Sequence, residues 1–201
     1  MGAPVPALAW KTQVMEADRV SDAIAAVPRE WFLPVRERDR AAYDGPIAIG
    51  HGQTNSQPRT VEAMLRLLAV RPGDRVLDVG SGSGWTTGLL AHLTGPEGTV
   101  RGLELKEELV AFGRDNLARG GWPWASIDAA TPGELGDPAG APYDRILVSA
   151  EARDLPTELV SQLGEEARMV LPVAGEMLLI ERGSGSSQVS RHGRYRFVPL
   201  R

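Results

Sequence analysis

The chain has no cysteine among its 201 residues. This absence excludes a disulfide framework, a thiolate nucleophile and a zinc site with cysteine ligands. The sequence also lacks a run of about 18 apolar residues that could form a membrane-spanning helix. Its N-terminus has no basic segment followed by a continuous apolar core, as a secretory signal would have. We therefore expect a cytoplasmic protein that does not act in a membrane.

An excess of positive charge is lacking too. The 22 basic residues against 26 acidic ones leave a formal net charge of −4, so we expect no nucleic acid and no anionic membrane as a partner. Metal ligands are also scarce. His92 and His192 have no acidic partners at metal-ligand spacing, and Asp144 alone does not make a magnesium cluster. We expect no metal.

What the sequence does contain is an apolar strand that runs into a glycine-alternating turn. Residues 76–84 read Val-Leu-Asp-Val-Gly-Ser-Gly-Ser-Gly and precede a predicted helix. Gly80, Gly82 and Gly84 can take positive φ and let a ligand lie against the backbone at the helix N-terminus. A dinucleotide site would place its third glycine at position 85, where this chain has Trp85. The spacing therefore favours S-adenosylmethionine over NAD.

Two acidic residues support this interpretation. Glu104 ends the next predicted strand, about 20 residues after the glycines, where a carboxylate grips a ribose diol. Asp78 lies inside the strand before the turn, where a buried carboxylate is costly unless it faces backbone donors or the cofactor. The alternative is a glycine turn that serves only packing, since an isolated GxG pattern is weak.

Strands and helices alternate around this turn. We predict strands at 75–79, 99–104, 124–127 and 145–149, helices at 85–93 and 106–119, and one apolar helix face made of Leu155, Leu159, Val160 and Leu163. Upstream we predict a helix at 12–27 stopped by Pro28, an extended loop at 43–58 and a helix that begins at Pro58. Downstream we predict strands at 168–173 and 176–181, a loop at 183–187 and a final strand that ends at Leu200.

This order predicts an α/β fold of the class I methyltransferase (Rossmann-like) type. The central sheet is expected to be mostly parallel, with helices on both faces and antiparallel closing strands. The length and the 42% hydrophobic content fit one domain over residues 1–201.

Five segments together resemble the protein L-isoaspartyl O-methyltransferase family. The most specific is Gly-Gln-Thr-Asn-Ser-Gln-Pro at 52–58, which is similar to the family's Gly-Gln-Thr-Ile-Ser-Gln-Pro. The others are Val27 to Pro34, Ala42 to Gly50, Ala141 to Val148 and Arg196 to Leu200. Five matches in the correct order over nearly the whole chain make coincidence implausible.

The resemblance implies methyl transfer from S-adenosylmethionine to the α-carboxylate of L-isoaspartyl residues in damaged proteins or peptides. The ester then promotes repair through a succinimide. It implies a monomer in which residues 1–70 hold N-terminal helices and a substrate loop, and 71–201 hold the cofactor. The expected catalytic-site residues are Ser56 and Thr54, beside Gly52, Gln53 and Gln57 of the substrate loop. The expected cofactor-binding residues are Asp78, Gly80, Gly82, Gly84, Glu104 and Asp128.

The chain departs from the family pattern at two places. The family usually carries Gly-Asp-Gly at the adenine end of the cofactor, where this chain has Ile127-Asp128-Ala129 and keeps only the carboxylate. In the substrate loop Asn55 replaces the usual isoleucine, which exchanges an apolar contact for a polar one. Both departures bear on cofactor and substrate binding.

The implied reaction needs no general base. A carboxylate with a pKa of roughly 3.5 to 4 is already ionised at neutral pH, so the protein must orient it and exclude water. The hydroxyls of Thr54 and Ser56 can donate hydrogen bonds to it. The alternative for Ser56 is an ordinary N-cap of the helix that begins at Pro58.

Other side chains receive simpler interpretations. His51 is expected to be a solvated loop residue that could also meet substrate. Trp85 is expected near the methionine or ribose part of the cofactor, and Trp122 and Trp124 chiefly in the core.

Two other functions stay open. The first is a dedicated enzyme that methylates an aspartate in one partner peptide to drive imide formation, motivated by Asn55 and by the altered segment at Asp128. The second is a cofactor-binding module without turnover.

Overall fold

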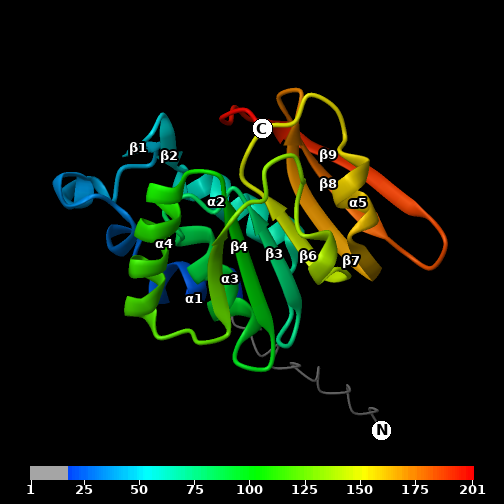
Figure 1. Ribbon diagram of the computed structural model, residues 1–201, viewed down its shortest axis with the longest axis horizontal. Helices are drawn as coiled ribbons and strands as arrows, with labels where there is room; N and C mark the ends of the chain where they lie inside the picture. The colour runs from blue at the N-terminus through cyan, green and yellow to red at the C-terminus, as the bar shows by residue number, and fades with distance from the viewer. Residues whose placement is uncertain (1–17) are drawn as a thin grey trace, which may run out of the picture.

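The centre of the molecule is a seven-stranded sheet with strand order β5-β4-β3-β6-β7-β8-β9 (Figure 1). The computed structural model describes residues 18–201. Pairs β5-β4, β4-β3, β3-β6 and β6-β7 are parallel, and β8 and β9 close the sheet in antiparallel pairing. The predicted α/β fold with a mostly parallel sheet and antiparallel closing strands is confirmed.

Four parallel strands lie around the glycine turn. They are β3 (Arg75–Val79), β4 (Thr99–Glu104), β5 (Ala125–Ala129) and β6 (Tyr143–Val148). Four of the five residues of β3 are buried, as expected of a central parallel strand that is covered on both faces. The predicted bounds of β3 and β4 match the structure residue for residue.

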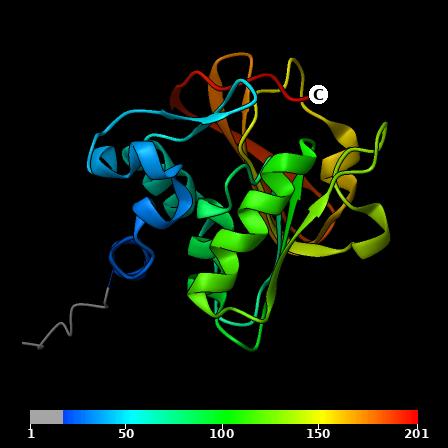
Figure 2. The same ribbon diagram turned by 60° about the vertical axis from the view of Figure 1, so that its left-hand side comes forward.

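Helices cover both faces of the sheet. On one face α1 (Arg19–Ala26), α2 (Pro58–Leu68) and α3 (Trp85–Thr94) enclose the larger apolar cluster, which includes Val76 and Leu147. On the other face Leu159 of α5 (Thr157–Ser161) packs near Leu77 and Ile146. Figure 2 shows α4 (Glu107–Gly120) in front of the sheet, where it packs on β5.

Helix α3 is buried along every residue except His92. Such a helix is apolar all round rather than amphipathic, and it runs directly from the glycine turn. Helix α2 instead buries one stripe, made of Val61, Met64, Leu65 and Leu68. Pro58 occupies its first turn, where a missing N–H costs nothing.

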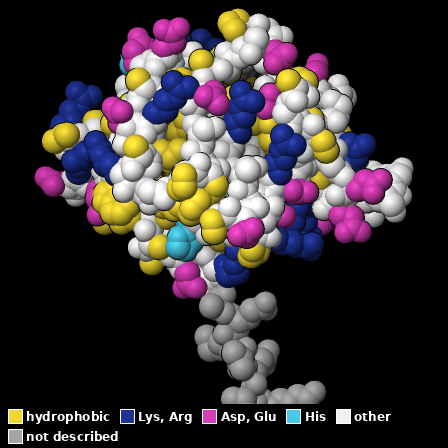
Figure 3. All heavy atoms as spheres, turned by 60° about the horizontal axis from the view of Figure 1, so that its bottom comes forward, with side chains coloured by type: hydrophobic (Ala, Val, Ile, Leu, Met, Phe, Trp, Pro, Cys, Tyr) yellow, Lys and Arg dark blue, Asp and Glu magenta, His cyan; other side chains and the backbone are white. Residues whose placement is uncertain are grey.

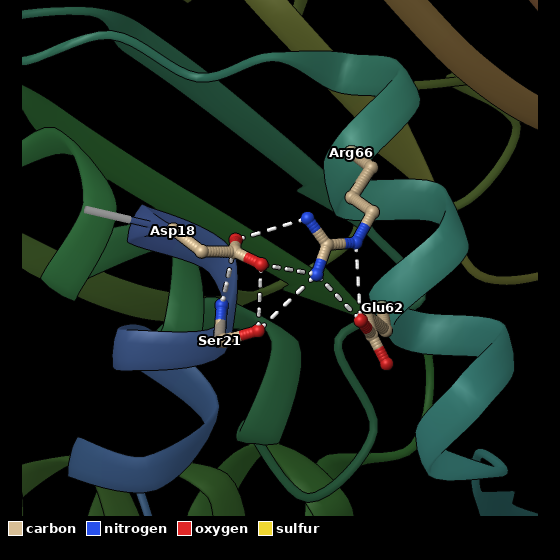
Figure 4. A network of polar contacts seen from close by, with 4 residues as sticks. All are labelled: Asp18, Ser21, Glu62 and Arg66. Atoms are coloured by element: carbon tan, nitrogen blue, oxygen red, sulfur yellow. Dashed lines mark hydrogen bonds and ion pairs between the residues drawn. The ribbon is translucent and has the colours of Figure 1, made fainter. Parts of the chain in front are cut away.

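A polar network fastens α1 to α2 (Figure 4). The Arg66 guanidinium donates to Asp18 at 2.7 and 2.9 Å, to Glu62 at 2.6 Å and to Ser21 at 3.2 Å. Asp18 also caps α1 by accepting from the Ser21 amide. The hydrogen bonds from Arg66 hold the pKa of Asp18 below its usual range. The predicted helix over 12–27 is therefore present from Arg19, and residues 12–17 lie outside the described part of the chain.

The segment between α1 and α2 is more structured than predicted. Short 3-10 helices span η1 (Arg29–Phe32) and η2 (Val35–Arg40). Residues 43–58, expected as an extended loop, contain a two-stranded sheet of β1 (Ile47–Gly50) and β2 (Gln53–Asn55). The alternating burial of Ile47 and Ile49 gives β1 an inner face, and the many Gly, Asn and Ser residues around it obscured that pattern.

The end of the chain also differs from the prediction. Strand β7 (Leu163–Val173) begins five residues early, β8 spans Glu176–Arg182, and β9 lies at Ser187–Arg194. A final strand ending at Leu200 is wrong, because residues 196–200 make only an isolated bridge between Glu151 and Pro199. Strand β9 escaped notice because its side chains are largely exposed and polar, so its pairing rests on backbone hydrogen bonds.

Surface charge follows the balanced composition. On the face shown in Figure 3, basic and acidic side chains are interspersed around a central group of apolar side chains. Among the described helices, none is long and apolar enough to cross a membrane.

Gly84 is a position where the fold requires glycine. Its φ is +91°, and a Cβ built there would lie 2.8 Å from Ile127 Cδ1 and 3.2 Å from the Gly113 carbonyl oxygen. We expect Gly84→Ala to lower the free energy of unfolding by about 2 to 5 kcal/mol, combining a left-handed backbone with overpacking. Gly121→Ala is the control, because Gly121 has φ +71° but no atom within 4 Å of its added Cβ. It should cost only about 1 to 2 kcal/mol. Urea unfolding measures both, and equal losses would contradict the packing argument.

Candidate active site

A cavity opens at the carboxyl ends of β3, β4 and β6, where the strand order reverses. Ligands of open α/β sheets bind at this edge. The cavity holds about 1080 Å³ of empty space including its open mouth. Its walls come from residues 53–56, 79–83, 85–86, 103–106, 130, 134–136, 149–150 and 198–201. The β1–β2 hairpin and the C-terminal segment both lie at the upper side of Figures 1 and 2, and residues from each line the cavity.

The glycine turn forms the floor of this cavity. The amides of Gly80 and Ser81 donate to the Leu103 carbonyl at 2.9 and 3.0 Å, so the turn is fixed to the end of β4. Gly80 (φ +78°) and Gly82 (φ +54°) line the cavity. Gly84 instead faces α4 and begins α3. Two of the three predicted glycines thus present bare backbone to a ligand, and the third sets the helix.

Glu104 points into the cavity from the end of β4. Its carboxylate accepts from the Gly82 amide at 3.0 Å and from the Lys106 amide at 2.9 Å. Only 7% of Glu104 is exposed. The two backbone amides hold both oxygens in place and leave them lone pairs for further donors.

Asp78 lies beneath the turn and not in the cavity lining. It is fully buried and accepts from the hydroxyls of Thr86 and Thr87, each at 2.7 Å. Its second oxygen has no hydrogen-bond partner among the described residues. Burial raises the pKa of Asp78 to about 6. Asp78 thus anchors the first turn of α3 through side-chain hydroxyls, not backbone amides.

The predicted substrate loop reaches the same cavity. Gln53, Thr54, Asn55 and Ser56 line it, whereas Gly52 and Gln57 do not. Gln57, not Ser56, is the N-cap residue of α2. No hydrogen bond joins the Ser56 hydroxyl to any residue from 18 to 201, so helix capping does not explain Ser56.

Comparison of the chain with known proteins identifies its family. The family model described as protein-L-isoaspartate(D-aspartate) O-methyltransferase matches residues 7–201. The chain belongs to this family.

Relatives named for the same activity share much of the sequence. The protein-L-isoaspartate O-methyltransferase of Methanopyrus kandleri is 42% identical over 92% of this chain and 84% of its own. That of Pyrococcus horikoshii is 36% identical over 93% of this chain and 86% of its own. A putative member from Plasmodium falciparum, solved in complex with S-adenosyl-L-homocysteine, superposes with a TM-score of 0.82 at 27% identity and covers 93% of this chain and 92% of that one.

Asp128 lies in β5, at the position for which the family resemblance predicts a contact with adenine. It lies outside the cavity lining and pairs with Arg114 at 2.8 Å and with Arg101 at 3.3 Å. Within the sheet Asp128 is paired with Leu103 of β4, and Ala130 and Glu134 belong to the cavity wall further along the chain. The contact of Asp128 with adenine stays a prediction, and in this structure its carboxylate pairs with two arginines.

Asn55 has an internal partner on each side. Only 5% of it is exposed, its Oδ1 accepts from Arg29 Nε at 2.7 Å, and its Nδ2 donates to Ser83 Oγ at 3.3 Å. Its amide is therefore used within the protein, although the residue borders the cavity. The expected exchange of an apolar substrate contact for a polar one does not describe its contacts.

Sequence reasoning missed Arg29. This side chain is 5% exposed and donates to the backbone carbonyls of five residues on the segment that leads to Ser56. Its guanidinium also lies 5.4 Å from the centroid of Trp85. Burial lowers the pKa of Arg29 to about 10, so it stays charged at neutral pH. Arg29 belongs to residues 27–34, one of the segments that resemble the family. A charged residue among apolar ones there could have indicated a buried guanidinium.

The tryptophans and His51 lie at defined places in the structure. Trp85 lines the cavity and donates from Nε1 to the Val27 carbonyl at 3.1 Å. Trp122 and Trp124 pack against the larger apolar cluster. His51 lies at the exposed hairpin turn, 3.9 Å from Glu108. Within residues 18–201 no group of three or more His, Asp or Glu side chains could hold a metal.

The buried Asp78 makes stability depend on pH. Its pKa rises from 3.8 to about 6 in the native state, so between these values the native protein binds more protons than the unfolded one and stability falls as pH rises. We expect wild type to lose about 2 kcal/mol from pH 4 to pH 7 relative to Asp78→Asn. Urea unfolding at several pH values measures this. Asp115→Asn, at an exposed position of α4, controls for net charge, and parallel wild-type and Asp78→Asn profiles would contradict the prediction.

Proposed function

We infer that this protein transfers a methyl group from S-adenosylmethionine to the α-carboxylate of L-isoaspartyl residues in damaged proteins or peptides. The observation that carries this inference is one cavity that brings together the glycine turn, Glu104 and the hydroxyl-bearing residues Thr54, on β2, and Ser56, just after it. Family membership and the names of the relatives support the same reaction.

The residues present fit the cofactor. Gly80 and Gly82 offer bare backbone, and Glu104 offers oriented carboxylate oxygens to a ribose diol. The Ser81 hydroxyl is 4% exposed and has no hydrogen-bond partner among the described residues. This hydroxyl is enclosed by protein, so Ser81 meets the cavity through its other atoms. We propose Gly80, Ser81, Gly82 and Glu104 as the cofactor cradle, with Asp78 and Gly84 supporting it from below.

When bound, S-adenosylmethionine supplies an electrophilic methyl on its sulfonium. The protein's own part is to hold the substrate carboxylate in line and to keep water out. A carboxylate is ionised at neutral pH and needs no base. We propose that Ser56 and Thr54 donate hydrogen bonds that orient it, since neutral hydroxyls position an anion without removing its charge. Gln53 of the same strand borders the site.

The cavity lining carries charges of both signs. Lys106 and Arg201 are part of it beside Glu104 and Glu134, and the two cationic groups can attract a carboxylate. Once the methyl ester forms, the neighbouring backbone amide nitrogen attacks the ester carbonyl and expels methoxide, which leaves with the amide proton as methanol. An unmethylated carboxylate would have to expel oxide, which is a far poorer leaving group. Succinimide formation then opens the route to repair.

A narrow substrate range has less support than a broad one. The dedicated-enzyme alternative was motivated by Asn55 and Asp128, and both side chains have partners within the protein. Neither therefore selects a particular peptide. The module without turnover has no feature of its own in this structure that favours it.

We further propose that the chain works as a monomer in the cytoplasm, with residues 1–201 as one domain. The lack of cysteine suits a reducing compartment. The balanced charge favours neither nucleic acid nor membrane as a partner.

The first test is methylation of a short isoaspartyl peptide. We expect labelled methyl to pass from S-adenosylmethionine to this peptide and not to the same peptide with a normal aspartate. A panel of unrelated isoaspartyl sequences should be accepted as well. Cofactor binding without transfer to any of them would overturn the proposed function and support a dedicated enzyme or a binding module.

Two variants separate substrate from cofactor roles. Ser56→Ala should lower kcat by about tenfold or more, because it removes an orienting donor, while the Kd for S-adenosylhomocysteine changes little.

Glu104→Ala should weaken the binding of S-adenosylhomocysteine by about ten- to a hundredfold, because charged acceptors are lost. Steady-state kinetics and calorimetry measure the two effects. Unchanged turnover in Ser56→Ala would remove Ser56 from the site, and intact affinity in Glu104→Ala would show that the cofactor cradle is misplaced.

A further inference from the structure

A chain of buried polar side chains joins the substrate strand to the cofactor turn. It runs from Arg29 on η1 through the Asn55 amide on β2 to the Ser83 hydroxyl in the glycine turn. Each of these residues is at most 5% exposed. Because a guanidinium can only donate, the amide oxygen of Asn55 faces Arg29 and its NH₂ group is left for Ser83. Asn55 thus satisfies two different elements at once.

The same turn is held from its other side. The fully buried Asn116 of α4 donates to the Ser83 carbonyl at 3.0 Å. Arg119 donates to Asn116 at 3.0 Å and to the Trp31 carbonyl at 3.2 Å. Trp31 belongs to η1, as Arg29 does. The hydrogen bonds therefore close a ring through η1, β2, the glycine turn and α4.

We propose that Asn55 is a positioning residue, which holds the strand of Thr54 and Ser56 at a fixed place relative to the cofactor turn. Its neighbours in sequence carry the hydroxyls that line the cavity, while its own amide is anchored on Arg29 and Ser83. The expected effect on turnover rests on the proposed function. The expected effect on the strand itself does not.

An apolar side chain at position 55 cannot form the two hydrogen bonds that anchor Asn55 to Arg29 and Ser83. Leucine has nearly the shape of asparagine but offers no acceptor to Arg29 Nε and no donor to Ser83. A buried donor that loses its partner costs free energy, so the strand is expected to shift or loosen until water reaches those groups. A misplacement of about 1 Å can lower a rate about a hundredfold.

The test compares Asn55→Leu with Asn55→Asp and Thr94→Val. Asn55→Asp keeps an acceptor for Arg29 and can accept from the Ser83 hydroxyl, so it is the conservative rescue. Thr94→Val removes one buried hydrogen bond, to the Asp74 carbonyl at 2.8 Å, at the far end of α3. It controls for lost stability alone.

Hydrogen exchange of the amides in residues 52–57 is the readout that needs no substrate. We expect exchange about tenfold or more faster in Asn55→Leu, a rate near wild type in Asn55→Asp, and no change there in Thr94→Val. Equal exchange in wild type and Asn55→Leu would overturn the proposal. If Asn55→Leu does not fold, Ser83→Ala takes its place, and wild-type exchange in that variant would overturn it equally.

Kinetics on an isoaspartyl peptide give the second readout. We expect kcat/KM to fall about ten- to a hundredfold in Asn55→Leu, with the Kd for S-adenosylhomocysteine within about threefold of wild type and most activity restored in Asn55→Asp. Turnover at the wild-type level in Asn55→Leu would contradict a positioning role. Absence of turnover in wild type itself would overturn the proposed function, and the exchange measurement would then decide the role of Asn55 alone.

Discussion

The site depends on one buried guanidinium. Arg29 is inside the protein without a carboxylate among its hydrogen-bond acceptors, which are five backbone carbonyls and the Asn55 amide oxygen. A buried charge is tolerated only when its donors are satisfied, so the segments that supply these carbonyls must stay where they are. Lysine has three donors on one nitrogen and cannot reach such a spread of acceptors. The irregular path from Ala41 to Ser56 is thereby built around a single side chain.

This arrangement explains how a polar, glycine-containing segment can have a defined shape. It has few apolar side chains to bury besides Ile47 and Ile49, so packing alone would leave it poorly fixed. Hydrogen bonds from Arg29 to its backbone replace part of the missing packing. The same guanidinium lies over Trp85, the first residue of α3. The strand that we assign to the substrate and the helix that follows the cofactor turn are thus ordered by a shared group.

The sequence was sufficient wherever local pattern and tertiary environment agreed. Strands β3 and β4 are largely buried runs with clear turn residues at their ends. The glycines at 80, 82 and 84 have the positive φ values that the sequence argument assumed for them. It failed where a side chain's direction was set by distant partners. Asp128 keeps the residue type of the family pattern, but no local pattern indicated its ion pairs with Arg101 and Arg114. Asn55 and Arg29 are 26 positions apart, and no periodicity links them. Strand β9 has no apolar face to detect because its side chains are largely exposed and polar.

The chemistry explains why backbone conformation, more than reactive side chains, makes this site. The nucleophile is ionised before it binds and the electrophile comes with the cofactor, so the protein has no proton to remove. What it must supply is a fixed distance between two ligands, and distances are set by rigid connections. The glycine turn is pinned to β4 through Leu103, and Glu104 is pinned to the turn through the Gly82 amide. The substrate strand is pinned to the same turn through Asn55 and Ser83. Since every one of these connections ends at the glycine turn, a change there moves both ligands together, whereas a change at Asn55 moves one relative to the other.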